Sequence, residues 1–266
     1  MVMGPTHAMS GAAVGLAVSQ LLPEHWGGVS SPQEAFVYAG LAAGAALLPD
    51  LDAPQATVSR AFGPLSQALS RLVENSSQLL VNLTRGRRDQ RCRNGHRTAT
   101  HTLWFALLSG GAAAALIAFF GEVAAIVMLF ILLNLAMRGL VPEWSKKRDW
   151  YVVTAISALL ALLAWEYVPL TASALVMGSA VTVGVLTHLA GDLITKQGIP
   201  LLAPIIPWKG KRWWFFRLPG PLRISASGSA DKVLLTLFSI LVVFQTVAIG
   251  AGVVVSSDMF PALTLS

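Results

Sequence analysis

Residues Val123–Val141 read VAAIVMLFILLNLAMRGLV, an almost unbroken apolar run in which Asn134 and Arg138 are the strongly polar side chains. An α-helix needs about 20 predominantly apolar residues to cross the hydrocarbon core of a bilayer. The length and composition of the run therefore predict a transmembrane helix. Membrane embedding is the first constraint on the fold.

The same criterion, applied outward from this run, predicts six further transmembrane helices. The first two in the chain are slightly short and rich in Ala and Gly, which suits close helix packing in lipid. In chain order the seven predicted helices are Ala8–Leu22, Ala35–Leu48, Leu103–Phe120, Val123–Val141, Tyr151–Pro169, Ala172–Leu189 and Val233–Val255.

The composition supports a membrane protein over a soluble one. Of the 266 residues, 55% are hydrophobic and 12% are charged, whereas soluble domains usually carry about 25% charged residues. We therefore predict an all-α polytopic membrane protein with one membrane-embedded domain over residues 1–266. No Lys or Arg precedes the first apolar run, so we expect a retained helix there and not a signal peptide. The single cysteine, Cys92, excludes an intramolecular disulfide and a multi-Cys zinc site.

The 19 basic residues fall in three regions: eight between Arg60 and Arg97, four between Arg138 and Arg148, and seven between Lys196 and Lys232. Seven helices that begin in the cytoplasm place all three regions on one side of the membrane. The positive-inside rule then predicts a cytoplasmic N-terminus and an outer C-terminus. The net charge of +6 is thus a topology signal first and an attraction to anionic lipid second. We expect membrane lipids as partners, and no nucleic acid.

Residues able to bind a metal ion or transfer a proton lie at the cytoplasmic ends of four predicted helices. They are His7 before the first helix, Asp50 and Asp52 at the end of the second, His96 and His101 at the start of the third, and His188 and Asp192 at the end of the sixth. A mixture of His and Asp without thiolate suits Zn²⁺, Mn²⁺ or Fe²⁺. Such sites commonly activate a water molecule.

The local spacings are compatible with metal binding. His188 and Asp192 are four residues apart and share one helix face, so they can bind one ion together, or the carboxylate can orient the imidazole. An extended turn after Pro49 would aim both following aspartates inward or let one of them bridge two ions. His96 and His101 are separated by about 140° on an ideal helix, so both reach one site only if His96 stands in the turn before the helix.

Each feature also has a simpler explanation. The PDLD stretch, residues 49–52, is typical of a cap or turn, and an HxxxD spacing arises readily by chance. A single histidine at a membrane boundary is usually interfacial, which is how we interpret His25 on the outer side. The joint placement of four histidines with the aspartates at one membrane face favours a metal site.

The ordered motifs resemble those of a known family. They are TH (residues 6–7), LLPDLD (47–52), GHRTATHT (95–102), THLAGDLITKQGIPLLAP (187–204) and WWFFRLPGPLRI (213–224). Their order and spacing over approximately residues 4–232 are similar to those of the YdjM-type family of bacterial inner-membrane metal-dependent hydrolases. The resemblance implies the metal ligands His7, Asp50, Asp52, His96, His101, His188 and Asp192. It also places Arg97 at the family's basic position.

The chain departs from the family pattern at two places. The family's late Glu is absent, and the stretch SGSADK offers Asp231 or Lys232 instead. The insert from Thr57 to Arg93 is longer and more basic than the family connection. We interpret residues 53–95 as a basic cytoplasmic loop that is either solvated or in contact with an anionic surface.

A second distinctive loop covers about residues 196–230 and interleaves aromatic with basic side chains. The stretch PIIPWKGKRWWFFRLPG, residues 204–220, carries three Trp, two Phe, two Lys and two Arg. Such a mixture forms an interfacial anchor, with rings at head-group depth and cations near lipid phosphates. The alternative is a lid that admits a lipid-like substrate.

The leading functional hypothesis is a membrane-bound, metal-dependent hydrolase with its active site at the cytoplasmic face of the bacterial inner membrane. It would hold one to three ions, with zinc favoured. The phosphoester bond is favoured by analogy with zinc phospholipases C and P1-type nucleases, which have similar His and Asp ingredients. In this hypothesis Asp52 helps to activate water, and Arg97 offsets charge on the phosphoryl oxygens of an amphiphilic substrate.

Two alternatives belong to other classes. Metal-ion transporters place ionisable groups near the bilayer midplane, whereas the predicted helix centres here contain none. The second alternative is a non-catalytic membrane scaffold with a structural metal. Metal-dependent hydrolysis by the purified protein separates the hydrolase from both.

Reporter fusions test the predicted orientation. Fusions after Ser31, Gly121 and Ser266 should report the outer compartment, because the connections there lack basic residues. Fusions within residues 60–95 or after Lys147 should report the cytoplasm. A cytoplasmic C-terminus would contradict the seven-helix arrangement and require one weak helix to be re-entrant or absent.

Overall fold

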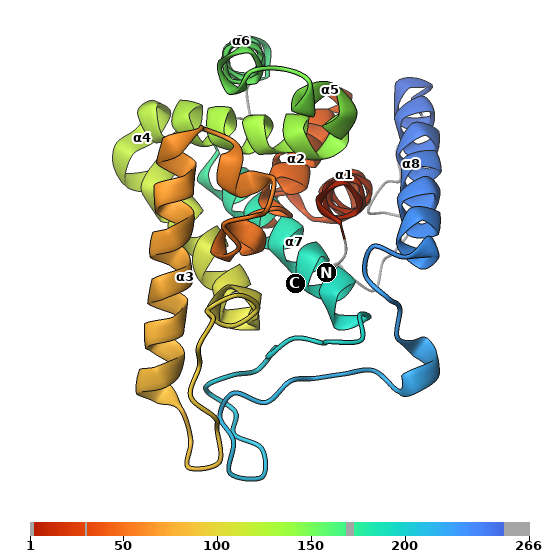
Figure 1. Cartoon of the computed structure of the whole chain (residues 1–266). Helices are drawn as coiled ribbons and strands as arrows, with labels where there is room; N and C mark the ends of the chain where they lie inside the picture. The colour runs from red at the N-terminus through yellow and green to blue at the C-terminus, as the bar shows by residue number, and fades with distance from the viewer. Residues whose placement is uncertain (1–2, 30, 169–172, 253–266) are drawn as a thin grey trace.

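A computed structural model describes residues 3–29, 31–168 and 173–252 of the chain (Figure 1). This part is helical, with isolated β-bridges and no strand among the described residues. The predicted all-α class is therefore confirmed. The α-helices are α1 (Gly4–Leu21), α2 (Pro32–Ala45), α3 (Pro64–Thr84), α4 (Leu103–Leu140), α5 (Pro142–Lys146), α6 (Trp150–Tyr167), α7 (Ala174–Leu193) and α8 (Ser229–Gly250). The 3₁₀ helices are η1 (Glu24–Trp26), η2 (Pro49–Asp52), η3 (Val58–Arg60), η4 (Ala99–His101) and η6 (Gly220–Leu222).

Five segments of the described chain are long and apolar enough to cross a membrane: Pro32–Asp52, α4, α6, α7 and α8. The first predicted helix, now α1, is not among them. The predicted helix ends at Pro169, Ala172 and Val253–Val255 lie outside the described residues, as does the C-terminal Ser266. The count of seven spans and the orientation in the membrane stay predictions.

Helix α4 combines the third and fourth predicted helices. A straight helix of its 38 residues would be about 57 Å long, almost twice the hydrocarbon thickness of about 30 Å. It is broken at Gly121, where φ is 58° and ψ is −136°. This conformation is accessible to glycine because it has no Cβ. The two halves run in different directions (Figure 1), in agreement with the two separate apolar runs of the sequence.

Small residues allow the central helices to approach one another closely. A Cβ added to Gly184 of α7 would lie 2.3 Å from the carbonyl oxygen of Ala42 in α2. A Cβ added to Gly44 of α2 would lie 2.0 Å from the carbonyl oxygen of Leu132 in α4. Backbones in such contact are typical of membrane helix interfaces. Helix α2 thus lies at the centre of the bundle, and α8 lies at its edge.

Residues 53–95, predicted to be a loop, contain the helix α3, so this prediction is wrong for Pro64–Thr84. Leu65, Leu69 and Leu72 recur at helical spacing on its exposed face. The serines of the other face, among them Ser70 and Ser77, are buried. These serines lower the hydropathy of the segment and hide the leucine periodicity. Helix α3 runs along the opposite side of the bundle from α8 (Figure 1) and packs on η2, η3 and η4.

The aromatic and basic loop before α8 is joined to the end of α3. The Asp89 Oδ2 atom accepts hydrogen bonds from the backbone N–H groups of Arg212 and Trp213, at 2.9 and 3.1 Å. Trp213 Nε1 donates to Thr84 Oγ1 at 2.9 Å. The two segments run side by side below the bundle (Figure 1). The two predicted loops are therefore one structural unit, and its role as lid or anchor stays a prediction.

Replacing Gly44 by Ala should destabilise the fold. The new methyl group would overlap the α4 backbone, and overpacking typically costs about 1–3 kcal/mol. The matched control is Gly111→Ala in α4, where an added Cβ meets no atom within 4 Å and helix propensity improves by up to about 1 kcal/mol. Thermal melting in detergent should show a lower midpoint for Gly44→Ala only. Equal midpoints for the two variants would contradict the close α2–α4 contact.

Candidate metal centre

Five of the predicted ligands meet at one end of the bundle. His7 lies in the first turns of α1, Asp50 in η2, His101 in η4, and His188 and Asp192 in the last turns of α7. Asp50 is 2% exposed, and the other four are 0% exposed. Two overlapping groups among them can hold a metal ion: His7, His188 and Asp192; and Asp50, His101 and His188.

The donor atoms have spacings that suit a small cation. His101 Nε2 lies 3.2 Å from His188 Nε2 and 3.4 Å from Asp192 Oδ2. His188 Nε2 lies 3.7 Å from Asp192 Oδ2 and 3.8 Å from Asp50 Oδ1. Two ligand atoms about 2.0–2.1 Å from a tetrahedral zinc ion stand roughly 3.3 Å apart. The residues present therefore fit a transition-metal ion.

The two groups share one donor atom of His188. Its Nδ1 lies 2.7 Å from the backbone carbonyl oxygen of Ala46, so Nδ1 carries the proton of the neutral ring. Only Nε2 of His188 is then available as a metal ligand. The two groups therefore form one connected centre, because this single atom cannot serve two separate sites.

His7 completes the centre from the α1 side. Its ring stacks on the His188 ring at a centroid distance of 3.8 Å, and its Nε2 lies 3.4 Å from Asp192 Oδ1. Gly191 permits this approach, because a Cβ there would lie 3.1 Å from His7 Cε1. Close packing against the His7 ring thus explains why a glycine stands at this position of the HLAGD stretch.

Asp52 and His96 lie beside the two ligand groups and belong to neither. Asp52 accepts hydrogen bonds from Arg97 N at 3.0 Å and Thr100 Oγ1 at 2.5 Å, and its Oδ1 is 2.7 Å from His96 Nδ1. Its Oδ2 also lies 3.4 Å from His101 Nδ1. A carboxylate behind a ligand histidine fixes the orientation of the ring. This geometry gives Asp52 an orienting position, while its predicted ligand role stays a prediction.

Arg97 is fully buried and contacts Asp192. The Nη2–Oδ1 distance is 2.5 Å, and Nη1 donates to Thr195 Oγ1 at 3.1 Å and Gln197 Oε1 at 3.3 Å. Its φ of 56° lies in the left-handed region, and its backbone N–H points at Asp52. The guanidinium therefore balances part of the buried negative charge.

Sequence reasoning missed the roles of Thr100 and Thr195. Thr102 is the N-cap of α4, and its side chain accepts a hydrogen bond from Phe105 N, so Thr100 is not used as a helix cap. Thr100 lies between Asp52 and His101, with its Oγ1 3.0 Å from His101 Nδ1. Both threonines lie within the quoted motifs, next to the candidate ligands. Their position in those motifs was the available signal.

The centre has an excess of negative charge. The carboxylates of Asp50, Asp52 and Asp192 face one guanidinium, that of Arg97. Burial disfavours the charged form of His101, but hydrogen bonds and charge from Asp192 and Asp52 outweigh burial and raise the pKa of His101 to about 9. Additional positive charge, from a proton or a metal ion, therefore stabilises this arrangement.

Asp231 acts elsewhere. It is 3% exposed and accepts a hydrogen bond from the backbone N–H of Met3 at 3.3 Å. Met3 is the N-cap residue of α1, one turn before His7. Asp231 therefore holds the start of the helix that carries His7, and neither Asp231 nor Lys232 belongs to the two ligand groups.

The fold and the centre define a class: an all-helical membrane protein whose helix ends enclose His and Asp side chains able to hold a metal ion. Within this class, the chain belongs to the YdjM inner membrane protein family, whose model matches residues 1–140 and 151–253. The resemblance inferred from the motifs is confirmed, and the matched ranges contain every candidate residue of the centre. No curated protein and no solved structure matches the chain.

Metal analysis tests the centre directly. Protein purified without chelator should contain roughly one to three transition-metal ions per chain. His101→Ala and His188→Ala should each lower this content and leave folding in detergent intact. His25→Ala is the matched control, because His25 is exposed in η1 and should change nothing. Elemental analysis that finds no metal after reconstitution with Zn²⁺, Mn²⁺ or Fe²⁺ would remove the basis of the centre.

Proposed function

We propose that this protein is a membrane-bound, metal-dependent hydrolase that cleaves a phosphoester bond in an amphiphile drawn from the cytoplasmic leaflet of the inner membrane. The convergence of five buried His and Asp side chains at one end of the helices carries the proposal. A buried cluster with this charge excess is costly unless it is compensated. A catalytic metal centre compensates it and gives it a use.

The proposed ligands are His101, His188 and Asp192, with His7 and Asp50 beside them. Zinc is favoured, and manganese or iron is the alternative, because the donors are imidazole and carboxylate without thiolate. When bound, the metal supplies Lewis acidity and makes water a better nucleophile near neutral pH. The phosphoester preference rests on the analogy with other His and Asp hydrolytic centres.

The protein's own side chains supply the proton transfer. Hydrolysis forms a bond from water oxygen to phosphorus and breaks the bond from phosphorus to the leaving oxygen. The proton lost by water needs a base within hydrogen-bonding reach. Asp50 Oδ1 is buried without a hydrogen-bond partner and faces His188, so it suits this role. In our proposal Asp50 accepts the proton of the attacking water and then passes it to the leaving oxygen.

Asp52 and Arg97 position the centre in this proposal. Asp52 orients His101 through Nδ1, and its carboxylate also contacts His96, Thr100 and the backbone N–H of Arg97. The Arg97 guanidinium holds Asp192. Its Nε has no hydrogen-bond partner, which leaves one donor for the predicted contact with a phosphoryl oxygen. Such preorganised donors stabilise charge that develops in the transition state.

The position of the cluster argues against a transporter. His7 lies at the start of α1, His101 lies just before α4, and Asp192 lies at the end of α7. Transport sites usually lie near the midplane between discontinuous helices. A cluster at helix ends is suited to chemistry at the membrane boundary. A scaffold with a structural metal is separated from a hydrolase by activity alone.

Removing one carboxylate charge at a time tests the proposal. Asp50→Asn and Asp52→Asn retain shape, so turn-forming aspartates would lose about 1 kcal/mol of stability or less and keep full activity. If they serve the metal centre, hydrolysis should fall by at least about a hundredfold. The measurement is metal-dependent hydrolysis of a chromogenic phosphodiester, with thermal melting in the presence and absence of metal.

Glu143→Gln is the matched control for loss of a carboxylate. Glu143 lies in α5, and its side chain is 82% exposed beside Lys146. This variant should hydrolyse the phosphodiester at the wild-type rate. If Asp50→Asn and Asp52→Asn do the same, the two aspartates are turn residues and the active-site assignment is wrong.

A further inference from the structure

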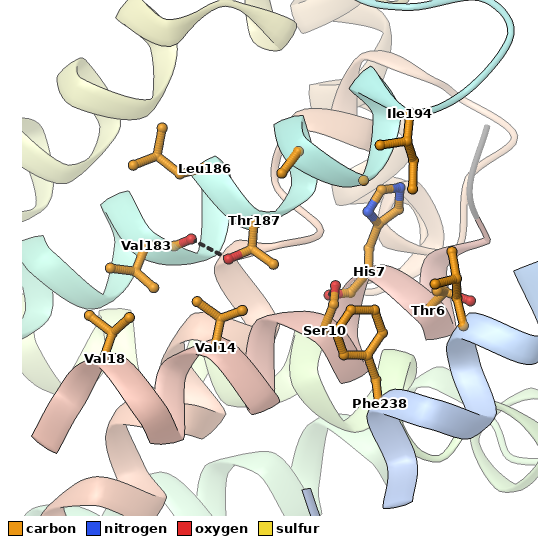
Figure 2. Close-up of a pocket in the computed structure, with 13 residues that line it drawn as sticks. Thr6, His7, Ser10, Val14, Val18, Val183, Leu186, Thr187, Ile194 and Phe238 are labelled. Atoms are coloured by element: carbon orange, nitrogen blue, oxygen red, sulfur yellow. Dashed lines mark hydrogen bonds between the residues drawn. The ribbon is translucent and has the colours of Figure 1, made fainter. Parts of the chain in front are cut away.

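An elongated groove of about 520 Å³ lies between α1, α7 and α8 and reaches the metal centre (Figure 2). Small-molecule sites usually have volumes of about 300–1,000 Å³. Its walls include Val14 and Val18 of α1, Val183 and Leu186 of α7, and Leu234 and Phe238 of α8. His7 stands at one end and belongs to both the groove and the centre.

The groove is apolar along its length and polar at one end. Thr187 Oγ1 donates to the Val183 carbonyl at 2.8 Å (Figure 2), and Ser10 Oγ donates to the His7 carbonyl at 3.0 Å. These hydroxyl groups are thus satisfied by backbone. At the inner end, Thr6 Oγ1 and His7 Nδ1 are buried without a hydrogen-bond partner. Buried polar atoms of this kind are stabilised by a polar ligand group.

The length of the groove matches one leaflet. Along α1 it extends from His7 to Val18, a rise of about 16 Å at 1.5 Å per residue. Half of a hydrocarbon core of about 30 Å is about 15 Å. Figure 2 shows Val14 and Val18 facing the side chains of α7, with His7 at the opposite end from Val18. The groove is therefore as long as the chain region of a single lipid in the leaflet that borders the centre.

Helix α8 borders the groove at the end where His7 lies, through Leu234 and Phe238. Its outer face carries exposed apolar side chains, including Leu237, Val243 and Phe244. It packs mainly on α1, and the groove residues Leu234 and Phe238 are half-buried. A hydrocarbon chain that enters beside α8 leaves one apolar environment for another and needs no passage through water.

From these observations we infer that the groove binds a single hydrocarbon chain of a membrane amphiphile, with the phosphoryl head group placed at His7. The head-group chemistry rests on the proposed function, whereas the binding of the chain does not require hydrolysis. The substrate class is thereby narrowed to phosphoesters with at least one long alkyl or acyl chain. The hydrocarbon chain moves into the groove from surrounding lipid, which competes for the same site. The position of the bound hydrocarbon chain in the protein is therefore a better test than its affinity.

Photocrosslinking measures that position. The probes are two hexadecyl phosphate derivatives in nanodiscs, one with a diazirine near the head group and one with a diazirine near the chain end. The first should label peptides around Thr6 and Ser10, and the second should label peptides around Val18 and Val183, as identified by mass spectrometry. Labelling that does not move with the diazirine, or that is confined to the outer face of α8, would overturn the proposal.

A larger side chain inside the groove should exclude the hydrocarbon chain of the probe. Val14→Trp should reduce labelling inside the groove by roughly tenfold, as expected when a packed site is overfilled. Val243→Trp is the matched control, because Val243 is 63% exposed on the outer face of α8. It should leave groove labelling unchanged. If Val14→Trp folds and is labelled like wild type, the proposal fails; if it does not fold, the two diazirine positions in wild type still decide.

The two proposals fail in different ways. Groove labelling without metal-dependent hydrolysis would retain the chain site and remove the hydrolase. Hydrolysis of the phosphodiester with labelling only on the outer face of α8 would retain the hydrolase and remove the chain site. A hexadecyl probe without phosphate should label the groove less than the phosphate probe, and equal labelling would remove the head-group contact at His7.

Discussion

The arrangement of the candidate metal centre depends on the contacts of one buried carboxylate, that of Asp192. Its Oδ1 lies 2.5 Å from Arg97 Nη2 and 3.4 Å from His7 Nε2, and its Oδ2 lies 3.4 Å from His101 Nε2. A buried carboxylate is tolerated only when it is paired and hydrogen bonded. Asp192, on α7, meets this requirement with partners from α1 and from the segment before α4, which carries both Arg97 and His101. Satisfying one buried charge thus fixes the relative positions of three parts of the chain.

The scaffold makes this pairing possible through small residues. Gly44 and Gly184 bring α4 and α7 against α2, and Gly191 brings α7 against the ring of His7. Helix α3 stands outside this bundle and packs on η2 and η4, the two short helices that carry Asp50 and His101. The central helices therefore set the distances between the ligand-bearing ends, and α3 supports the connections that end there.

The sequence was sufficient to predict that histidines and aspartates from four helix ends meet. Apolar runs locate the helix ends, and the distribution of basic residues predicts that these ends share one side of the membrane. The separate positions of Asp50 and Asp52 were not predictable, because they depend on the 3₁₀ geometry of η2 and not on an extended turn. Burial of Arg97 depends on contacts with Thr195 and Gln197, almost a hundred residues away. The groove beside His7 was also not predictable from the sequence, because no spacing rule gives the packing of α8 on α1.

The end of α2 has a consequence for the chemistry of a distant residue. An α-helix leaves its last carbonyl groups without intrahelical partners, and Pro49 has no N–H with which to close a 3₁₀ turn onto Ala46. His188 Nδ1 donates a hydrogen bond to the carbonyl oxygen of Ala46 at 2.7 Å. The tautomer of the imidazole is therefore dictated by main chain alone. The position at which α2 ends therefore determines which nitrogen of His188 is free to bind a metal ion.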